Sequence, residues 1–218
     1  MKKLLVLSLV ACFFIACNDS NKSEEPKKTE AQLIAEASGY HNWDNVNEIK
    51  FTFNVDRPDR HFDRTWTWEP KTGNVKMESL NDTVVFNHKA VDSASYGADT
   101  AFINDKYWLL APFNLMWDST ATITTSEREM APMSQDSLRM LTITYPSEGG
   151  YTPGDAYDIY YDDAYDIKEW VFRHKNGEEP NMITSWEDAK DINGIKIYTT
   201  HNGMSGGVKI HFTNVTIK

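Results

Sequence analysis

One stretch decides the fold of this chain: Ile49-Lys50-Phe51-Thr52-Phe53-Asn54-Val55. Its apolar residues fall at every second position, and in an extended chain such residues share one face. The next segment, Phe62-Asp63-Arg64-Thr65-Trp66-Thr67-Trp68, repeats the alternation, with Arg64 on the aromatic face. Two such segments so close together predict neighbouring antiparallel strands with one buried face.

The two-residue rhythm continues almost to the C-terminus. Further strands are predicted at residues 75–77, 82–88, 121–127, 138–145, 156–161, 167–174, 182–188, 195–200 and 208–217. Short turns such as Asn193-Gly194 join the later strands, and no helices separate them. The expected fold class is therefore mainly β (α+β), with a large antiparallel meander of about eleven strands. In the last strand the apolar positions change phase near Thr213-Asn214, which predicts a β-bulge.

Two segments interrupt the meander. Thr29 and Gln32 form a capping box that predicts a short helix over residues 30–38. Residues 99–110 have apolar side chains at helix-like spacing, and Pro112 is expected to end that helix. Residues 113–117 are apolar and are expected to be irregular. The central helix and loop together are predicted to cover the open face of the sheet.

The N-terminus has the pattern of a bacterial lipoprotein signal. Met1-Lys2-Lys3 is basic, the run from Leu4 to Ala16 is apolar, and Cys17 follows a small residue. The run is too short for a membrane span, which needs roughly 20 apolar residues. We expect residues 1–16 to be a signal peptide and Cys17 to carry the acyl anchor, for which palmitate is one expected chain. Cys12, after Leu9-Val10-Ala11, is the alternative lipidation site, and an unlipidated signal peptide is the third possibility.

The rest of the chain is expected to form a tether and one domain. Residues 17–28 are polar and predict a flexible tether, and residues 29–218 predict a single folded domain. The 218-residue chain has a net charge of −10 and no basic cluster, which argues against nucleic-acid binding. Both cysteines lie in the signal region, so the domain is expected to have no disulfide or thiolate chemistry.

These features together resemble a known group of proteins. The lipidation signal, the short helix before Trp43, the Ala111-Pro112-Phe113-Asn114-Leu115 segment and the hairpin sequence Tyr157-Asp158-Ile159-Tyr160-Tyr161-Asp162 are similar to uncharacterised envelope lipoproteins of the LolA/LolB-like outer-membrane lipoprotein-sorting superfamily. The resemblance implies an unclosed half-barrel of antiparallel strands, with helices at its mouth and an apolar cavity. It also implies acyl chains or other lipidic ligands in that cavity. No functional residue of the sorting proteins is matched to a position here.

The inner face of the sheet and the central segment supply the candidate ligand-binding residues. They are Arg64, Trp66, Trp68, Trp108, Phe113, Leu115, Met116 and Trp117. A buried guanidinium at Arg64 would need an acidic partner or a ligand headgroup. The alternatives are that Arg64 reaches water over the aromatic side chains and that the aromatic set is simply packed core. Tryptophans on an open sheet could also stack on sugar rings.

The patterns that suggest catalysis or metal binding are weak. Gly203-Met204-Ser205-Gly206-Gly207 matches a nucleophile elbow, but a strand follows it where a helix is required. The acidic run from Asp155 to Asp166 lacks calcium-loop spacing, and the histidines are scattered singly. We therefore expect no catalytic residues, no metal and no cofactor.

The predicted function is a non-enzymatic envelope lipoprotein that binds a lipid or other apolar ligand in a half-barrel cavity. It would be lipid-anchored to the outer membrane, with the periplasmic or surface face left open. The alternative is a glycan-binding or protein-interaction module on an envelope lipoprotein. The sequence leaves the oligomeric state open.

Overall fold

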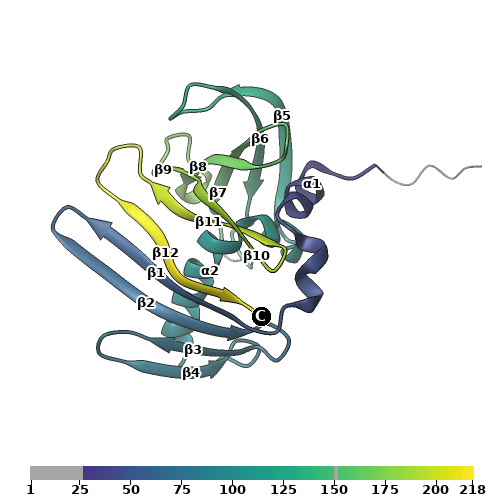
Figure 1. Ribbon diagram of the computed structural model, residues 1–218. Coiled ribbons are helices and arrows are strands. Elements are labelled where there is room, and N and C mark those ends of the chain that lie inside the picture. The colour runs from purple at the N-terminus through teal and green to yellow at the C-terminus, as the bar shows by residue number, and fades with distance from the viewer. Residues whose placement is uncertain (1–26, 150–151) are drawn as a thin grey trace, which may run out of the picture.

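The computed structural model describes residues 27–149 and 152–218 (Figure 1). The predictions for Cys12, Cys17, the signal peptide and most of the tether lie outside the described residues. The helical elements are α1 (Glu30–Ala37), the 3-10 helix η1 (Tyr40–Asn45), α2 (Tyr96–Trp117) and the 3-10 helix η2 (His174–Asn176). The strands are β1 (Ile49–Arg57), β2 (Arg60–Glu69), β3 (Asn74–Glu78), β4 (Thr83–Asn87), β5 (Thr122–Met130), β6 (Ser137–Thr144), β7 (Ala156–Tyr161), β8 (Ile167–Arg173), β9 (Met182–Ser185), β10 (Glu187–Ile192), β11 (Ile195–Asn202) and β12 (Lys209–Ile217).

These strands form two antiparallel sheets that do not close into a barrel. The larger sheet has the order β10-β11-β12-β1-β2-β3-β4, and the smaller one has the order β5-β6-β7-β8-β9. The sheets meet where β9 bridges to the end of β11, at Thr184 and Gly203. The opposite edges, β4 and β5, remain apart, and α2 connects them across the concave side (Figure 1). The expected mainly β, unclosed half-barrel is confirmed.

One predicted strand is divided in two, which makes twelve strands where about eleven were expected. The segment 182–188 pairs with β8 through β9 and with β11 through β10. Trp186 lies between the two strands and is buried, and Asp188 has a positive φ of 55°. The turn in the chain there directs β9 to one sheet and β10 to the other.

The central helix is longer than the sequence predicts. Pro112 was expected to end it, and residues 113–117 were expected to be irregular, but α2 runs through both. The helix bends at Leu110 (φ −123°, ψ 29°), because proline removes one backbone N–H and crowds the preceding turn. Helical structure then resumes and places Phe113 and Leu115 in the core.

Two local predictions are confirmed. The capping box forms, since Gln32 N donates to Thr29 Oγ1 (3.2 Å) and Thr29 N donates to Gln32 Oε1 (2.8 Å). The bulge in β12 forms as well, with a register shift against β1 between Lys50 and Thr52 and a φ of 52° at Asn214. The bulge returns the last residues of β12 to the inner face, where Ile217 is buried.

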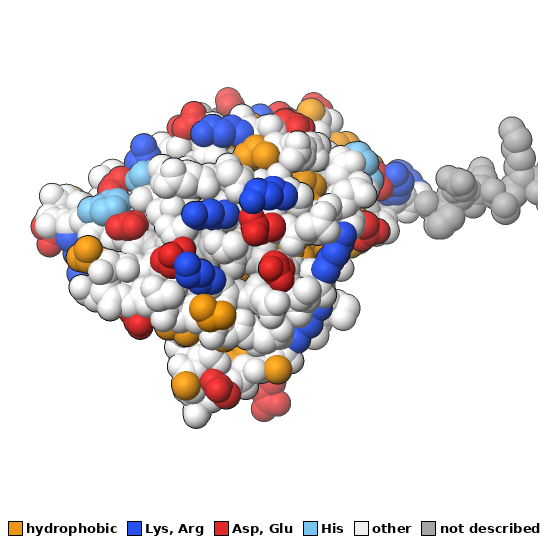
Figure 2. Space-filling view, turned by 60° about the horizontal axis from the view of Figure 1, so that its bottom comes forward, with side chains coloured by type: hydrophobic (Ala, Val, Ile, Leu, Met, Phe, Trp, Pro, Cys, Tyr) orange, Lys and Arg blue, Asp and Glu red, His pale blue; other side chains and the backbone are white. Residues whose placement is uncertain are grey.

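The core lies between α2 and the inner faces of the sheets. Ile49, Phe51 and Trp66 are fully buried in the larger sheet, and Phe102 and Leu109 of α2 pack into the same cluster. No helix in the described part of the chain is both long and apolar enough to cross a membrane. On the face in Figure 2, basic and acidic side chains are interspersed and hydrophobic ones are scattered.

Candidate functional site

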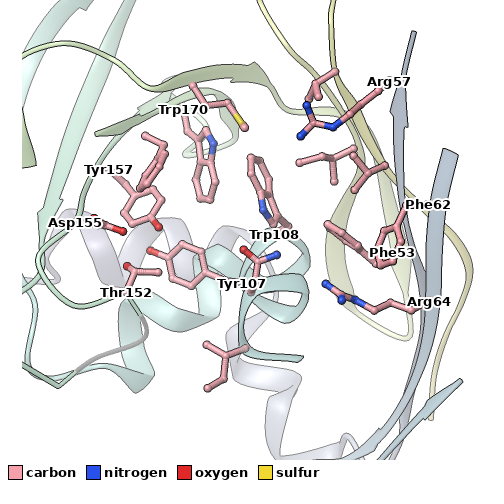
Figure 3. A pocket seen from close by; sticks show the side chains of 17 residues that line it. Phe53, Arg57, Phe62, Arg64, Tyr107, Trp108, Thr152, Asp155, Tyr157 and Trp170 are labelled. Carbon is pink, nitrogen blue, oxygen red and sulfur yellow. The ribbon is translucent and has the colours of Figure 1, made fainter. Parts of the chain in front are cut away.

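An apolar pocket of about 390 Å³ lies between α2 and the walls of the half-barrel (Figure 3). We call it the central pocket. Its α2 wall consists of Ile103, Asn104, Tyr107 and Trp108; its β1–β2 wall consists of Phe53, Val55, Arg57, Phe62 and Arg64. Side chains of β7, β8, β9 and β12 and of the segment before β7 complete the lining. The pocket has the size and apolar character typical of small-molecule sites, which range over roughly 300–1,000 Å³.

Strand alternation explains the β1–β2 wall. Phe53, Val55 and Arg57 are successive inward positions of β1, and Phe62 and Arg64 are inward positions of β2. The hairpin register sets Phe53 opposite Arg64 and Val55 opposite Phe62. The wall therefore consists of apolar side chains with one guanidinium at each end.

Arg64 is held by a buried carboxylate of α2. Its Nε and Nη2 atoms donate to the two oxygens of Asp105 at 2.5 and 2.9 Å, and Trp66 Nε1 donates to the same carboxylate at 2.8 Å. Burial raises the pKa of Asp105, and the hydrogen bonds from Arg64, Asn104 and Trp66 oppose that rise. The Arg64 side chain keeps 20% of its surface exposed, and its guanidinium lies 4.8 Å from the Phe62 ring centre. Of the alternatives left open for Arg64, the structure shows an acidic partner, Asp105.

The opposite wall carries tyrosines and tryptophans. The hydroxyl groups of Tyr107 and Tyr145 lie 3.0 Å apart, and Tyr157 packs against both rings. Burial raises the pKa of Tyr157 to about 12 and holds that of Tyr107 well above its usual value, so both phenols are neutral near pH 7. Trp108 lies between Trp170 and the buried imidazole of His201, with ring centres 4.4 and 5.4 Å away. This wall is apolar, with hydroxyl groups at one side.

A second depression adjoins the central pocket. It has a volume of about 630 Å³ and runs between the segment before β9 and the β11–β12 loop. We call it the outer groove. Arg57, Met182 and Val208 line both the central pocket and the outer groove. A ligand in the central pocket could therefore extend outward past these three side chains.

The predicted ligand-binding residues fall into two groups. Arg64 and Trp108 line the central pocket. Trp66, Trp68, Phe113, Leu115, Met116 and Trp117 do not line it; all are buried except Met116 and Trp117, which are half-buried. The aromatic members of this second group pack with Trp43 of η1 and Phe102 of α2, outside the central pocket.

The side chain of Lys106 lies among the aromatic side chains of that second group. Its ammonium lies 5.4 Å from the Trp68 ring centre and 5.1 Å from that of Trp117, and the residue is 2% exposed. Burial lowers the pKa of Lys106 to about 7, and the nearby Asp99 opposes the shift. Two tryptophans expected to face a ligand thus face a buried lysine of the same chain.

Arg57 and the tyrosine wall were missed from the sequence. Arg57 continues the inward row of Phe53 and Val55, so strand alternation alone could have identified it. Tyr107, Tyr157 and Trp170 come from elements far apart in the sequence, and only the folding of β7 and β8 over α2 brings them together.

The weaker motifs have structural explanations. Ser205 lies in the turn before β12, and its hydroxyl makes no hydrogen bond to a described histidine. In the acidic run, Asp158 is paired with Arg173, Asp163 with Arg128 and Asp166 with Lys196. Among residues 27–149 and 152–218, no group of three or more His, Cys, Asp or Glu side chains could hold a metal ion.

Comparison with known proteins supports the fold. No protein-family model and no curated protein sequence matches the chain. A DUF1329 family protein from Desulfovibrio piger is 11% identical and has a TM-score of 0.51, with 87% of this chain and 92% of that chain covered. An outer membrane lipoprotein-sorting domain from Vibrio parahaemolyticus is 9% identical and has a TM-score of 0.46, with coverage of 86% and 93%. At such low identity the similarity is one of fold alone.

Proposed function

We propose that this protein is an envelope lipoprotein that binds a lipid or another apolar ligand in the central pocket. One observation carries the proposal: a pocket of about 390 Å³, lined mainly by apolar side chains, lies between α2 and both sheets. Apolar surface that leaves water for such a pocket contributes roughly 25 cal/mol per Å². The protein would act by sequestering its ligand, without a chemical step.

The lipidation signal supplies the context for this role. Acylation at Cys17 would tether the domain to the outer membrane through residues 17–28, beside a source of apolar ligand. The known fold neighbours include a domain for lipoprotein sorting, which supports the choice of a lipidic ligand over other apolar molecules.

The glycan-binding alternative loses its proposed surface. It required Trp66 and Trp68 to stand in an exposed row, but their side chains are 0% and 7% exposed and lie under α2. An apolar ligand in the central pocket is the function that the geometry supports best.

The test has two parts: identification of any lipid bound to the purified protein, and substitutions that fill the central pocket. Organic extraction of several preparations of the full-length protein should release lipid. Ile103→Trp, which enlarges a pocket-lining side chain of α2, should reduce the amount extracted and the binding of a fluorescent fatty acid. Val208→Phe should do the same from the segment just before β12.

Val85→Trp is the matched control, because Val85 lies on β4, is 71% exposed and does not line the central pocket. This variant should bind like the wild type. If all preparations lack lipid and the two pocket variants bind the fluorescent fatty acid as well as the control does, the central pocket is not the ligand site.

A further inference from the structure

At the tip of the β1–β2 hairpin two arginines oppose each other on the inner face. The turn Pro58-Asp59 joins the strands, and the register pairs Arg57 of β1 directly with Arg60 of β2. Like charges directly opposite on one face of a sheet destabilise the strand pair. Both residues are exposed, so solvent screens part of this repulsion, and an anion bound close to them would remove more of it.

The nearest carboxylates along the chain, Asp56 and Asp59, form no ion pair with either arginine. Neither the Arg57 nor the Arg60 side chain makes a hydrogen bond or ion pair with any residue of 27–149 and 152–218. The nearest acidic side chain in the strand, Asp56, points to the outer face, where it accepts hydrogen bonds from His61 (2.6 Å) and His211 (2.9 Å). In contrast, the inward arginine farther along β2, Arg64, has both carboxylate oxygens of Asp105.

Arg57 also lies where the apolar pocket opens. It lines the central pocket, the outer groove and a smaller depression that also includes Asp56 and Lys209. Figure 3 shows the Arg57 and Arg64 side chains on one wall of the central pocket, with Phe53 between them. Asp155 is the only carboxylate among the described residues that line the pocket; it lies on the opposite wall in Figure 3 and is engaged by Lys175 N (2.8 Å) and His174 Nδ1 (3.0 Å).

We propose that the ligand is an anionic amphiphile whose acyl chain occupies the central pocket and whose carboxylate or phosphate is bound by Arg57 at the pocket mouth. This inference rests on the proposed function and names its ligand class. Arg60 adds positive charge on the same face of the hairpin. Any remaining headgroup extends into the outer groove.

The experiment compares probes that share an acyl chain and differ in charge. The full-length protein, freed of lipid, is titrated with palmitate, with palmitoyl lysophosphatidylglycerol and with neutral monopalmitoylglycerol, and the fluorescence of the pocket tryptophans is followed. Both anionic probes should bind more tightly than the neutral one. Arg57→Gln should weaken anionic binding roughly tenfold or more, because a charge-assisted hydrogen bond is lost, and should leave neutral binding unchanged.

Lys190→Gln is the matched control, since it removes the same charge from β10 at a position that lines none of the three depressions. It should leave all three affinities unchanged. If only palmitate binds tightly, the site is selective for carboxylates. If both anionic probes bind tightly, the site accepts either a carboxylate or a phosphate headgroup.

Two results would overturn the inference while leaving the proposed function intact. The wild type could bind the anionic and neutral probes with equal affinity, or Arg57→Gln could weaken the binding of both kinds of probe by the same factor. Failure of every probe to bind would overturn the proposed function as well. Arg57→Lys, which keeps the charge, should retain most of the preference for anionic probes.

Discussion

Single side chains determine the polarity of the interior, and Asp105 is the clearest example. It is completely buried and neutralises Arg64 across two hydrogen bonds. Removing one partner of a buried pair leaves the other charge without compensation, which typically costs about 3–5 kcal/mol. We expect Asp105→Ala to lower the unfolding free energy by roughly that amount in denaturant titrations.

The control for this prediction is Asp163→Ala, because the Asp163 side chain is 73% exposed where it pairs with Arg128. Exposed pairs contribute about 0–1 kcal/mol, so this variant should unfold nearly like the wild type. Equal effects of the two substitutions would show that the Asp105 pair has no special role in the interior.

His201 predicts a specific pH dependence of stability. Burial lowers its pKa to about 3, although its hydrogen bond to the Ser185 carbonyl opposes the shift. The unfolded chain binds this proton near pH 6.5 and the folded chain does not, so stability present above pH 6.5 is lost as the pH falls towards 3. The stability difference between the wild type and His201→Phe should be constant above pH 7 and should change by up to about 1.4 kcal/mol per pH unit below pH 6.

The measurement is denaturant unfolding of both proteins at several pH values. The change of unfolding free energy with pH is compared between the two proteins, because their absolute stabilities also differ through packing. Trp108→Phe changes a neighbouring ring that does not titrate, and its difference from the wild type should not vary with pH. A pH-independent difference for His201→Phe would mean that the pKa of His201 is the same in the folded and the unfolded protein.

At the scale of elements, the C-terminal end of α1 packs closely against the larger sheet at Gly39. Gly39 has a φ of +87°, and a Cβ atom there would lie 2.0 Å from the carbonyl oxygen of Gly194 in the β10–β11 turn. Backbone Lys196 N also donates to Ser38 O at 2.9 Å, so the end of α1 cannot move away freely. We expect Gly39→Ala to lower the unfolding free energy by about 2 kcal/mol or more.

Gly97→Ala is the matched control, since Gly97 lies in the first turn of α2 with open space around it. Alanine in a helix is favoured over glycine by roughly 0.5–1 kcal/mol, so this variant should be equal to or more stable than the wild type. A loss of stability in Gly97→Ala as large as that in Gly39→Ala would contradict the steric explanation.

For the whole molecule, the central pocket joins elements from both sheets and α2. A ligand that binds only the folded state stabilises it by RT ln(1 + [L]/Kd), about 2.7 kcal/mol at a hundredfold excess over Kd. Saturating palmitate should therefore slow amide hydrogen exchange in β1, β2, α2, β8 and β12 together. The β3–β4 hairpin lines no part of the pocket, so local exchange through its exposed edge should change least.

Ile103→Trp should abolish this protection, because the enlarged side chain takes the place of the ligand. Protection confined to one sheet, or protection that persists in the Ile103→Trp protein, would place palmitate outside the central pocket.

The sequence by itself determined the secondary structure and much of the fold. The period-two alternation of residues 49–55 and 62–68 depends only on residues that are close together in the sequence. The capping box and the β12 bulge are local features of the same kind. Arg64 could be selected from the same alternation, and Arg57 could have been. Pro112 misled the prediction, because tertiary packing holds a bent helix together across it.

Only the tertiary structure decided which inward residues line a cavity. The sequence made Trp66, Trp68 and Trp108 equal candidates for the ligand site, yet only Trp108 lines the central pocket, and Trp68 faces Lys106. The difference arises where α2 rests against the sheets, and that position is set by long-range packing and by the pair of Asp105 with Arg64. Alternation assigns a side chain to a face of a sheet; the packing of distant elements determines whether that face is filled or open.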